Sequence, residues 1–178
     1  MDCIVLAARI GSCHYDPEDL RCNCESDPRM ITRVYALIYD DVSRRLLLNR
    51  KDALLPPKLA TFEGLIGLFG GKIEEGEGPI EGLVRELNEE IPGISFNLES
   101  VKSINVPLSG TDEAEVFFIP YDLSGDNKSA PSVHEIRTAV CRGGEGEPML
   151  ASYEWLMLQP FEAFTPGVYA ICKDFFLW

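Results

Sequence analysis

The stretch that most limits what this chain can fold into runs from Gly70 to Glu90, GGKIEEGEGPIEGLVRELNEE, where a glycine-rich acidic loop gives way to an amphipathic pattern. Proline is favoured at the first helical position because its missing N–H would have no partner there. Pro79 therefore predicts the start of a helix, which we expect to extend to Ile91. Its apolar residues recur with the spacing of one buried helical face: Ile80, Leu83, Val84, Leu87 and Ile91.

Three glutamates of this predicted helix, Glu86, Glu89 and Glu90, are spaced at i, i+3 and i+4, so their carboxylates are expected to project together from a neighbouring face. Like charges this close repel one another unless a cation compensates them. Converging carboxylates form the hard-oxygen environment that Mg²⁺ or Mn²⁺ prefers. The helix alone leaves two alternatives open, a metal site or a solvated face on which Arg85 pairs with Glu81 or Glu89.

Strand-like segments precede and follow this helix. Residues 31–41 and 44–51 predict a β-hairpin, because two β-rich runs are joined by a short polar turn. Further extended segments are expected at residues 65–71, 98–108, 114–123, 134–142 and 153–159, and a second helix at residues 165–178. The pattern predicts an α+β protein, an α/β/α sandwich with a central mixed sheet flanked by helices.

Length and charge narrow the possible partners. A chain of 178 residues has the size of one ordinary domain, so we expect residues 1–178 to form a single domain, with the Cys-containing segment 1–30 packed on it. The net charge of −13 argues against binding a long nucleic acid, which needs many Lys and Arg. No stretch approaches the roughly 18 apolar residues of a membrane span, and Asp2 stands where a signal peptide is basic. We expect a cytoplasmic protein that does not bind membranes.

Several cysteines lie near the start of the chain. Cys13, His14, Cys22 and Cys24 fall within twelve residues, which raises the possibility of zinc. Structural zinc sites favour paired C-x2–4-C or H-x3–5-H spacing, and this segment has an adjacent Cys-His and a C-x-C instead. Free thiols in a loop are the favoured interpretation, and zinc is the alternative.

The glycines, acidic residues and arginine around the predicted helix stand at fixed positions. They fit the pattern G-x5-E-x7-R-E-U-x-E-E, where U is a bulky aliphatic residue: Gly71, Glu77, Arg85, Glu86, Leu87, Glu89 and Glu90. Seven specified positions are far more specific than a lone glycine motif. The segment resembles the Nudix box, and the order of strands and helices resembles the Nudix fold.

The resemblance departs from the family pattern at the end of the box, which continues x-G-U. This chain has Ile91, Pro92, Gly93 and Ile94, so either Pro92 takes the glycine place or one residue is inserted. A left-handed glycine commonly ends a helix, and Gly93 can do so one residue late. We expect the metal site to be unaffected.

The resemblance implies hydrolysis of a nucleoside diphosphate linked to another moiety, with Mg²⁺ or Mn²⁺ as the cofactor. Carried over by position, Glu86, Glu89 and Glu90 would be metal ligands and catalytic groups, and the Gly71 carbonyl a further ligand. A diphosphate resists attack by water because of its charge, and bound metal ions would neutralise it and activate a water.

The remaining box residues would support the site. Glu77 would pair with Arg85 and fix the loop against the helix, while Gly70 would permit a tight turn and close approach to substrate. The general base would be Glu89 or Glu90, or a glutamate elsewhere in the chain. Those considered are Glu113, Glu115, Glu135, Glu147 and Glu154.

The substrate is expected to be a small nucleotide. Phe69 and Trp155 are candidates for stacking on a base, and Arg50 for reaching a phosphate. A (d)NTP or an oxidised nucleotide is the first choice, and ADP-ribose or a nucleotide sugar is the alternative. Capped RNA and inositol pyrophosphates are disfavoured because basic residues are scarce.

Two alternatives belong to other classes. A non-catalytic Nudix module would sense a nucleotide without cleaving it, but such a protein is expected to have lost box carboxylates. A calcium-binding acidic helix without catalysis does not explain Gly71, Glu77 and Arg85. The aromatic C-terminus DFFLW fits either a core segment or the contact of a homodimer.

Overall fold

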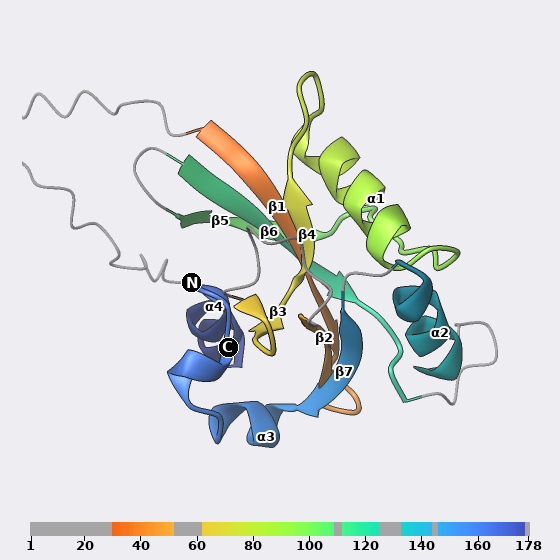
Figure 1. Cartoon of the computed structure of the whole chain (residues 1–178), viewed down its shortest axis with the longest axis vertical. Coiled ribbons are helices and arrows are strands. Elements are labelled where there is room, and N and C mark those ends of the chain that lie inside the picture. Colours follow the sequence, from red (N-terminus) through yellow and green to blue (C-terminus); the bar gives the residue numbers. More distant parts are fainter. Residues whose placement is uncertain (1–29, 52–61, 109–111, 125–132, 144–145, 177–178) are drawn as a thin grey trace, which may run out of the picture.

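A mixed seven-stranded sheet organises the protein in the computed structural model, which describes residues 30–51, 62–108, 112–124, 133–143 and 146–176 (Figure 1). The helices lie on both sides of the sheet, so the predicted α/β/α sandwich is confirmed. The strands are β1 (Met30–Asp40), β2 (Arg45–Arg50), β3 (Ile66–Gly67), β4 (Phe69–Lys72), β5 (Lys102–Pro107), β6 (Asp112–Pro120) and β7 (Glu147–Ser152). The helices are α1 (Pro79–Glu90), α2 (Val133–Gly143), α3 (Tyr153–Met157) and α4 (Val168–Phe176), with a 3-10 turn, η2, at Phe161–Ala163.

Strand β1 is the centre of the sheet. It pairs in parallel with β6 along one edge, and β6 in turn pairs antiparallel with β5. Its other edge is shared by two antiparallel strands: β4 lies opposite residues 33–36 and β2 lies opposite residues 38–40. Beyond this point β2 diverges to pair with β3, while its far edge pairs with β7. The edge of β1 therefore forks between β4 and β2.

Alternation along the strands divides the core into two layers. On one face, Val34, Ala36 and Ile38 of β1 belong to a buried cluster with residues of α1 and α2. On the other face, Leu37 of β1 belongs to a second cluster with residues of α3 and α4. Each face of the sheet is thus covered by helices, as Figure 1 shows with α1 and α2 on one side and α3 and α4 on the other.

The structure confirms most predicted elements. The hairpin is present as β1 and β2, the glycine-ended strand as β3 and β4, and the helices beginning near Pro79 and Thr165 as α1 and α4. Two predictions were wrong. Residues 134–142 lie in helix α2, because Ile136 and Ala139, one turn apart, pack into the core beside α1. Residues 153–158 form α3 and its end, capped by Ser152, while the expected strand lies earlier, as β7.

Helix α1 turns a slightly different face inward than its apolar pattern predicted. Leu83, Leu87 and Ile91 are buried as expected, but Ile80 is 44% exposed and Val84 41% exposed. Their places in the buried face are taken by Gly82 and Glu90. A small residue and a buried carboxylate therefore line the side of α1 that meets the sheet.

The end of α1 follows the expected pattern. Helix α1 ends at Glu90 with Ile91 as its C-cap, and Gly93, two residues later, adopts the positive φ of 82° that the chain reversal requires. No helix in the described ranges is long and apolar enough to cross a membrane. The cysteine-histidine group at residues 13–24 and the N-terminal segment 1–30, apart from Met30, lie outside the described residues, so the zinc alternative stays untested.

Candidate active site

Strand β4 places Gly70 and Gly71 beside the second half of helix α1, where Glu86 and Glu90 lie. Gly70 has a φ of 124°, and a Cβ at this position would overlap the Val34 carbonyl oxygen, so only glycine fits. At Gly71, a Cβ would stand 2.7 Å from both carboxylate oxygens of Glu86. The absence of a side chain at Gly71 is therefore what lets the Glu86 carboxylate lie against the β4 backbone.

The loop between β4 and α1 is closed by its own glutamates. The Glu74 amide donates to Oε2 of Glu77 at 3.0 Å, and the Gly78 amide donates to Oε2 of Glu81 at 2.8 Å. The second of these bonds satisfies a backbone donor at the helix N-terminus. The acidic composition of this loop therefore serves its own backbone as well as any ligand.

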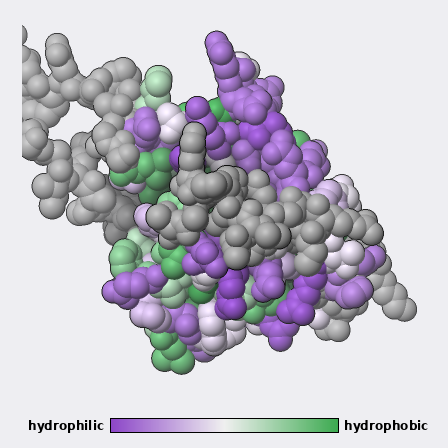
Figure 2. Space-filling view, viewed as in Figure 1, coloured by the Kyte–Doolittle hydropathy of each residue, from purple (hydrophilic) through white to green (hydrophobic). Residues whose placement is uncertain are grey.

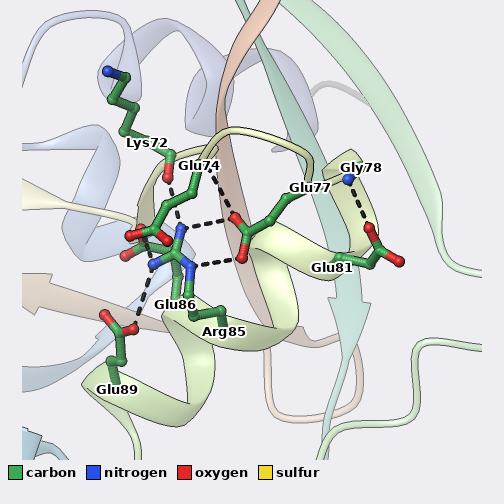
Figure 3. Close-up of polar contacts among 8 residues, drawn as sticks. All are labelled: Lys72, Glu74, Glu77, Gly78, Glu81, Arg85, Glu86 and Glu89. Atoms are coloured by element: carbon green, nitrogen blue, oxygen red, sulfur yellow. Dashed lines mark hydrogen bonds and ion pairs between the residues drawn. The ribbon is translucent and has the colours of Figure 1, made fainter.

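Arg85 is the centre of the polar contacts on α1 (Figure 3). Its Nε and Nη2 donate to the two oxygens of Glu77 at 2.9 and 3.1 Å, and Nη2 also donates to the Lys72 carbonyl at 2.8 Å. Its Nη1 donates to Glu86 at 2.9 Å and to Glu89 at 3.4 Å. The bidentate contact fixes the loop on the helix, in the arrangement that the box resemblance implies for these two residues.

The charges of this network reinforce one another. Hydrogen bonds from Arg85 and from the Glu74 amide hold the pKa of Glu77 below its usual value. The hydrogen bond to Glu77, and the carboxylate of Glu86, raise the pKa of Arg85 above that of a free guanidinium despite partial desolvation. Both groups are therefore ionised at neutral pH, and Arg85 supplies positive charge in the middle of the acidic helix.

Glu90 occupies a different environment from the other two glutamates. Its side chain is 1% exposed, and its Oε2 accepts a hydrogen bond from the Gly70 amide at 2.5 Å. Its Oε1 lies 3.4 Å from both Asn49 Nδ2 and Lys51 Nζ. The carboxylate thus lies in the fork between β2 and β4. There it accepts from the Gly70 amide of β4 and lies beside the Asn49 side chain of β2.

The three glutamates are therefore spread across a gradient of exposure. The Glu86 side chain is 12% exposed, Glu89 59% and Glu90 1%. Within the described part of the chain, no group of three His, Cys, Asp or Glu side chains is arranged to hold a metal ion. Arg85 draws Glu86 and Glu89 to itself, while Gly70 holds Glu90. The donors are all carboxylate oxygens beside a glycine backbone, which fits Mg²⁺ or Mn²⁺ in chemistry.

A pocket of about 480 Å³ opens beside this network, lined by Lys72, Ile73, Glu74, Glu75, Arg85 and Glu86. Its volume lies in the range of small-molecule sites, roughly 300–1,000 Å³. Figure 2 shows a hydrophilic surface over α1 and the loop before it. The pocket combines acidic groups with two cationic side chains: Lys72, and Arg85, whose guanidinium is already paired with Glu77 and Glu86.

The three residues considered for substrate binding are placed very differently. Arg50 is exposed at the end of β2, where its Nη2 lies 3.4 Å from the Met149 sulfur. Phe69 is fully buried in the core under α1, so its ring has no free face for a base. Trp155 is 36% exposed on α3, which Figure 1 places well away from α1. Of the three, only Arg50 is both exposed and close to the box, because it lies between Asn49 and Lys51.

The five glutamates outside the box that were considered as the general base lie in different parts of the fold. Glu147 on β7 pairs in register with Arg50, and so lies at the same end of β2 as the fork. Glu113 and Glu115 are on β6, across β1 from β4, and Glu115 accepts a hydrogen bond from Ser103 at 2.6 Å. Glu135 is exposed on α2, and Glu154 is on α3 in contact with Arg44. Of the five, only Glu147 lies on a strand that pairs with β2, the strand that carries Asn49.

Sequence analysis missed Asn49 and Lys51, which the fold brings to Glu90. The signal was weak: Asn49 is a single polar residue directly after the apolar run Leu46–Leu48, inside a predicted strand. It is fully buried in the structure. A buried polar residue in a strand commonly answers another buried polar group, but the sequence does not say which one.

Comparison with known proteins gives a consistent picture. The family model described as NUDIX domain matches residues 30–156. None of the curated proteins matches the chain. Among solved structures, that of the E. coli ORF135 protein is 23% identical, with a TM-score of 0.51, and the alignment covers 85% of this chain and 92% of that one. A MutT protein from Methanosarcina mazei Go1 is 19% identical, with a TM-score of 0.52 and coverage of 83% and 93%. At these identities the structural likeness concerns the fold.

Proposed function

The chain belongs to the NUDIX domain family and is a Nudix pyrophosphohydrolase, and on that premise we propose that it hydrolyses the pyrophosphate linkage of a nucleoside triphosphate or an oxidised nucleotide with Mg²⁺ or Mn²⁺. The observation that carries this proposal is the joining of a complete box to a pocket. Glu77 and Arg85 lock the loop onto α1, Gly71 leaves room for Glu86, and the side chains of Arg85 and Glu86 line the pocket.

The residues that would hold the metal are Glu86, Glu89 and Glu90, with the Gly71 carbonyl beside them. The bound ion would neutralise phosphate oxygens and lower the pKa of a water. Glu89 is the most exposed of the three, and its contact with Arg85 is long, at 3.4 Å. Its carboxylate is therefore the most accessible to a ligand, whereas Glu90 contributes from within the sheet fork.

Positive charge for the substrate is supplied by few side chains. Lys72 lines the pocket and Arg50 stands exposed at the end of β2. The pocket volume of about 480 Å³ suits one nucleotide and not a polymer. The net charge of −13 disfavours binding of a nucleic acid strand, so a small nucleotide is the substrate that these features support.

The proposal is tested by measuring phosphate and nucleotide release from a substrate panel. The panel contains dNTPs, 8-oxo-dGTP, ADP-ribose, ADP-glucose, NADH and diadenosine polyphosphates, each with Mg²⁺, Mn²⁺ or EDTA. We expect EDTA-sensitive release of pyrophosphate and a nucleoside monophosphate from a triphosphate. Cleavage of ADP-ribose or ADP-glucose in its place would transfer the assignment to the nucleotide-sugar alternative. Tight nucleotide binding without turnover would favour a sensing module and overturn the proposal.

A further inference from the structure

Glu90 is held by a strand that the box does not include. Asn49 and Lys51 lie 41 and 39 residues before it in the sequence, and both direct a side-chain nitrogen to its Oε1. A buried carboxylate costs free energy unless it is paired and hydrogen-bonded. The end of β2 therefore supplies what the box alone lacks, a fixed environment for its most buried carboxylate.

The direction of the Lys51 side chain is restricted by the contacts of its backbone and by burial. Its backbone is pinned on both sides, because its amide donates to the Leu65 carbonyl at 3.0 Å and its carbonyl accepts from the Gly64 amide at 2.7 Å. Its Cε passes Gly67, 3.6 Å from where a Cβ would stand. The side chain is only 17% exposed and ends beside Glu90. Lys51 is thus directed inward across β3.

The two oxygens of Glu90 are held unequally. Oε2 accepts a short bond from the Gly70 amide, 2.5 Å, whereas both contacts of Oε1 are 3.4 Å. Shorter bonds are stronger and better defined. Gly70 therefore anchors the carboxylate to β4 through Oε2, and Asn49 and Lys51 fix its rotation through Oε1.

We propose that Lys51, assisted by Asn49, is a positioning residue that orients the Glu90 carboxylate for metal binding and turnover. The inference rests on the proposed function, since it gives Glu90 its metal-facing role. Groups that orient metal ligands are as important as the ligands themselves, and their loss commonly lowers metal affinity or activity about 10- to 100-fold. Lys51 acts through Glu90 and not through the substrate.

The experiment compares Lys51→Met, which keeps the chain length and removes the charge, with Lys51→Arg, which keeps the charge. Arg45→Met is the matched control, because Arg45 is an exposed basic residue at the opposite end of the same strand. We expect Lys51→Met to lower kcat about 10- to 100-fold with little change in KM. Lys51→Arg should recover most of the activity, and Arg45→Met should resemble the wild type.

A second readout needs no substrate. Mn²⁺ affinity is measured by electron paramagnetic resonance, and Tm by thermal unfolding, for the wild type, Lys51→Met, Glu90→Gln and the double variant. We expect Lys51→Met to weaken Mn²⁺ binding, and to add almost nothing to either measurement once Glu90 is Gln. If the effects of the two changes simply add, or if Lys51→Met raises KM while kcat is unchanged, the positioning role is overturned. A wild type that cleaves nothing on the panel refutes the proposed function, while this cycle still decides the coupling of Lys51 to Glu90.

Discussion

Two buried carboxylates, Asp40 and Glu90, are held in two different ways in one fold. Asp40, 6% exposed, ends β1 and accepts from its own turn: Val42 and Ser43 amides at 2.9 and 3.1 Å, and the Ser43 hydroxyl at 2.6 Å. The Leu123 amide adds a fourth bond at 3.0 Å. Both oxygens of Asp40 are thus closely held, which is typical of a turn-stabilising aspartate.

Glu90 is more deeply buried, and its partners lie further away along the chain. Gly70 of β4 donates to it, and so do Asn49 and Lys51 at the end of β2, the last two at 3.4 Å. These partners are remote from Glu90 in sequence, whereas most of those of Asp40 come from its own turn. The comparison teaches that burial alone does not define a structural carboxylate: Asp40 is held mainly by its own turn, whereas Glu90 is held by residues that only the tertiary structure brings together.

The largest effect on activity is expected from removing the charge of Glu90. We expect Glu90→Gln to lower kcat by about 10²- to 10³-fold, since the site loses several kcal/mol of charge stabilisation. Its Tm should fall less than in Asp40→Asn, because the Gln oxygen can still accept from the Gly70 amide, and the contacts that are lost are the two longer ones, at 3.4 Å. Steady-state kinetics with Mg²⁺ and thermal unfolding measure both quantities, and Glu162→Gln, on the exposed turn η2, is the control. A near-normal kcat would show that Glu90 is no more functional than Asp40.

Asp40→Asn should give the opposite result. The amide keeps one acceptor oxygen but presents N–H groups to donors at the other, so we expect a loss of about 2–3 kcal/mol in the free energy of unfolding. The kcat of the folded variant should stay within about twofold of the wild type. Urea unfolding and kinetics at a temperature where the variant is folded test this. A large fall in kcat without loss of stability would refute the distinction.

The stabilisation of the fold by the Asp40 carboxylate should be lost at acidic pH. Burial opposes ionisation of its carboxyl, but hydrogen bonds from Ser43, Leu123 and Val42 outweigh it and hold the pKa below the ordinary value of 3.8. Because the folded pKa is the lower one, the carboxylate stabilises the fold above pH 3.8 and this contribution is lost as pH falls through the folded pKa. The difference in unfolding free energy between wild type and Asp40→Asn should therefore be largest at pH 7 and should shrink once the pH falls below 3.8. A difference independent of pH would contradict it.

The smallest effect is expected at Glu77. Hydrogen bonds from Arg85 lower its pKa, but the group is solvated, so Glu77→Gln should reduce Tm less than Asp40→Asn does. Mg²⁺ affinity should also change less than in Glu89→Gln, because Glu77 acts on the loop. Titration calorimetry with Mg²⁺ on the three variants measures this order. If Glu77→Gln weakens Mg²⁺ binding more than Glu89→Gln, Glu77 is a ligand and not a support.

Much of the fold followed from local pattern. The Pro79 start and the apolar spacing predicted α1, and the polar turn between two β-rich runs predicted the hairpin. The strand predicted at residues 134–142 was wrong, because Ile, Thr and Val favour strands locally. The site where Ile136 and Ala139 pack beside α1 is formed by distant parts of the chain. Local preference was overridden by tertiary packing at that point.

The sequence by itself determined the chemistry of the site: the spacing of Gly71, Glu77 and Arg85, and three glutamates within one helical turn, are properties of consecutive residues. Only the tertiary structure decided that Glu90 is buried while Glu89 is exposed. That decision depends on the fork between β2 and β4, which brings Asn49 and Lys51 across about 40 residues of chain. Helical spacing fixes the direction of a side chain on its own helix, but what it meets depends on segments remote in sequence.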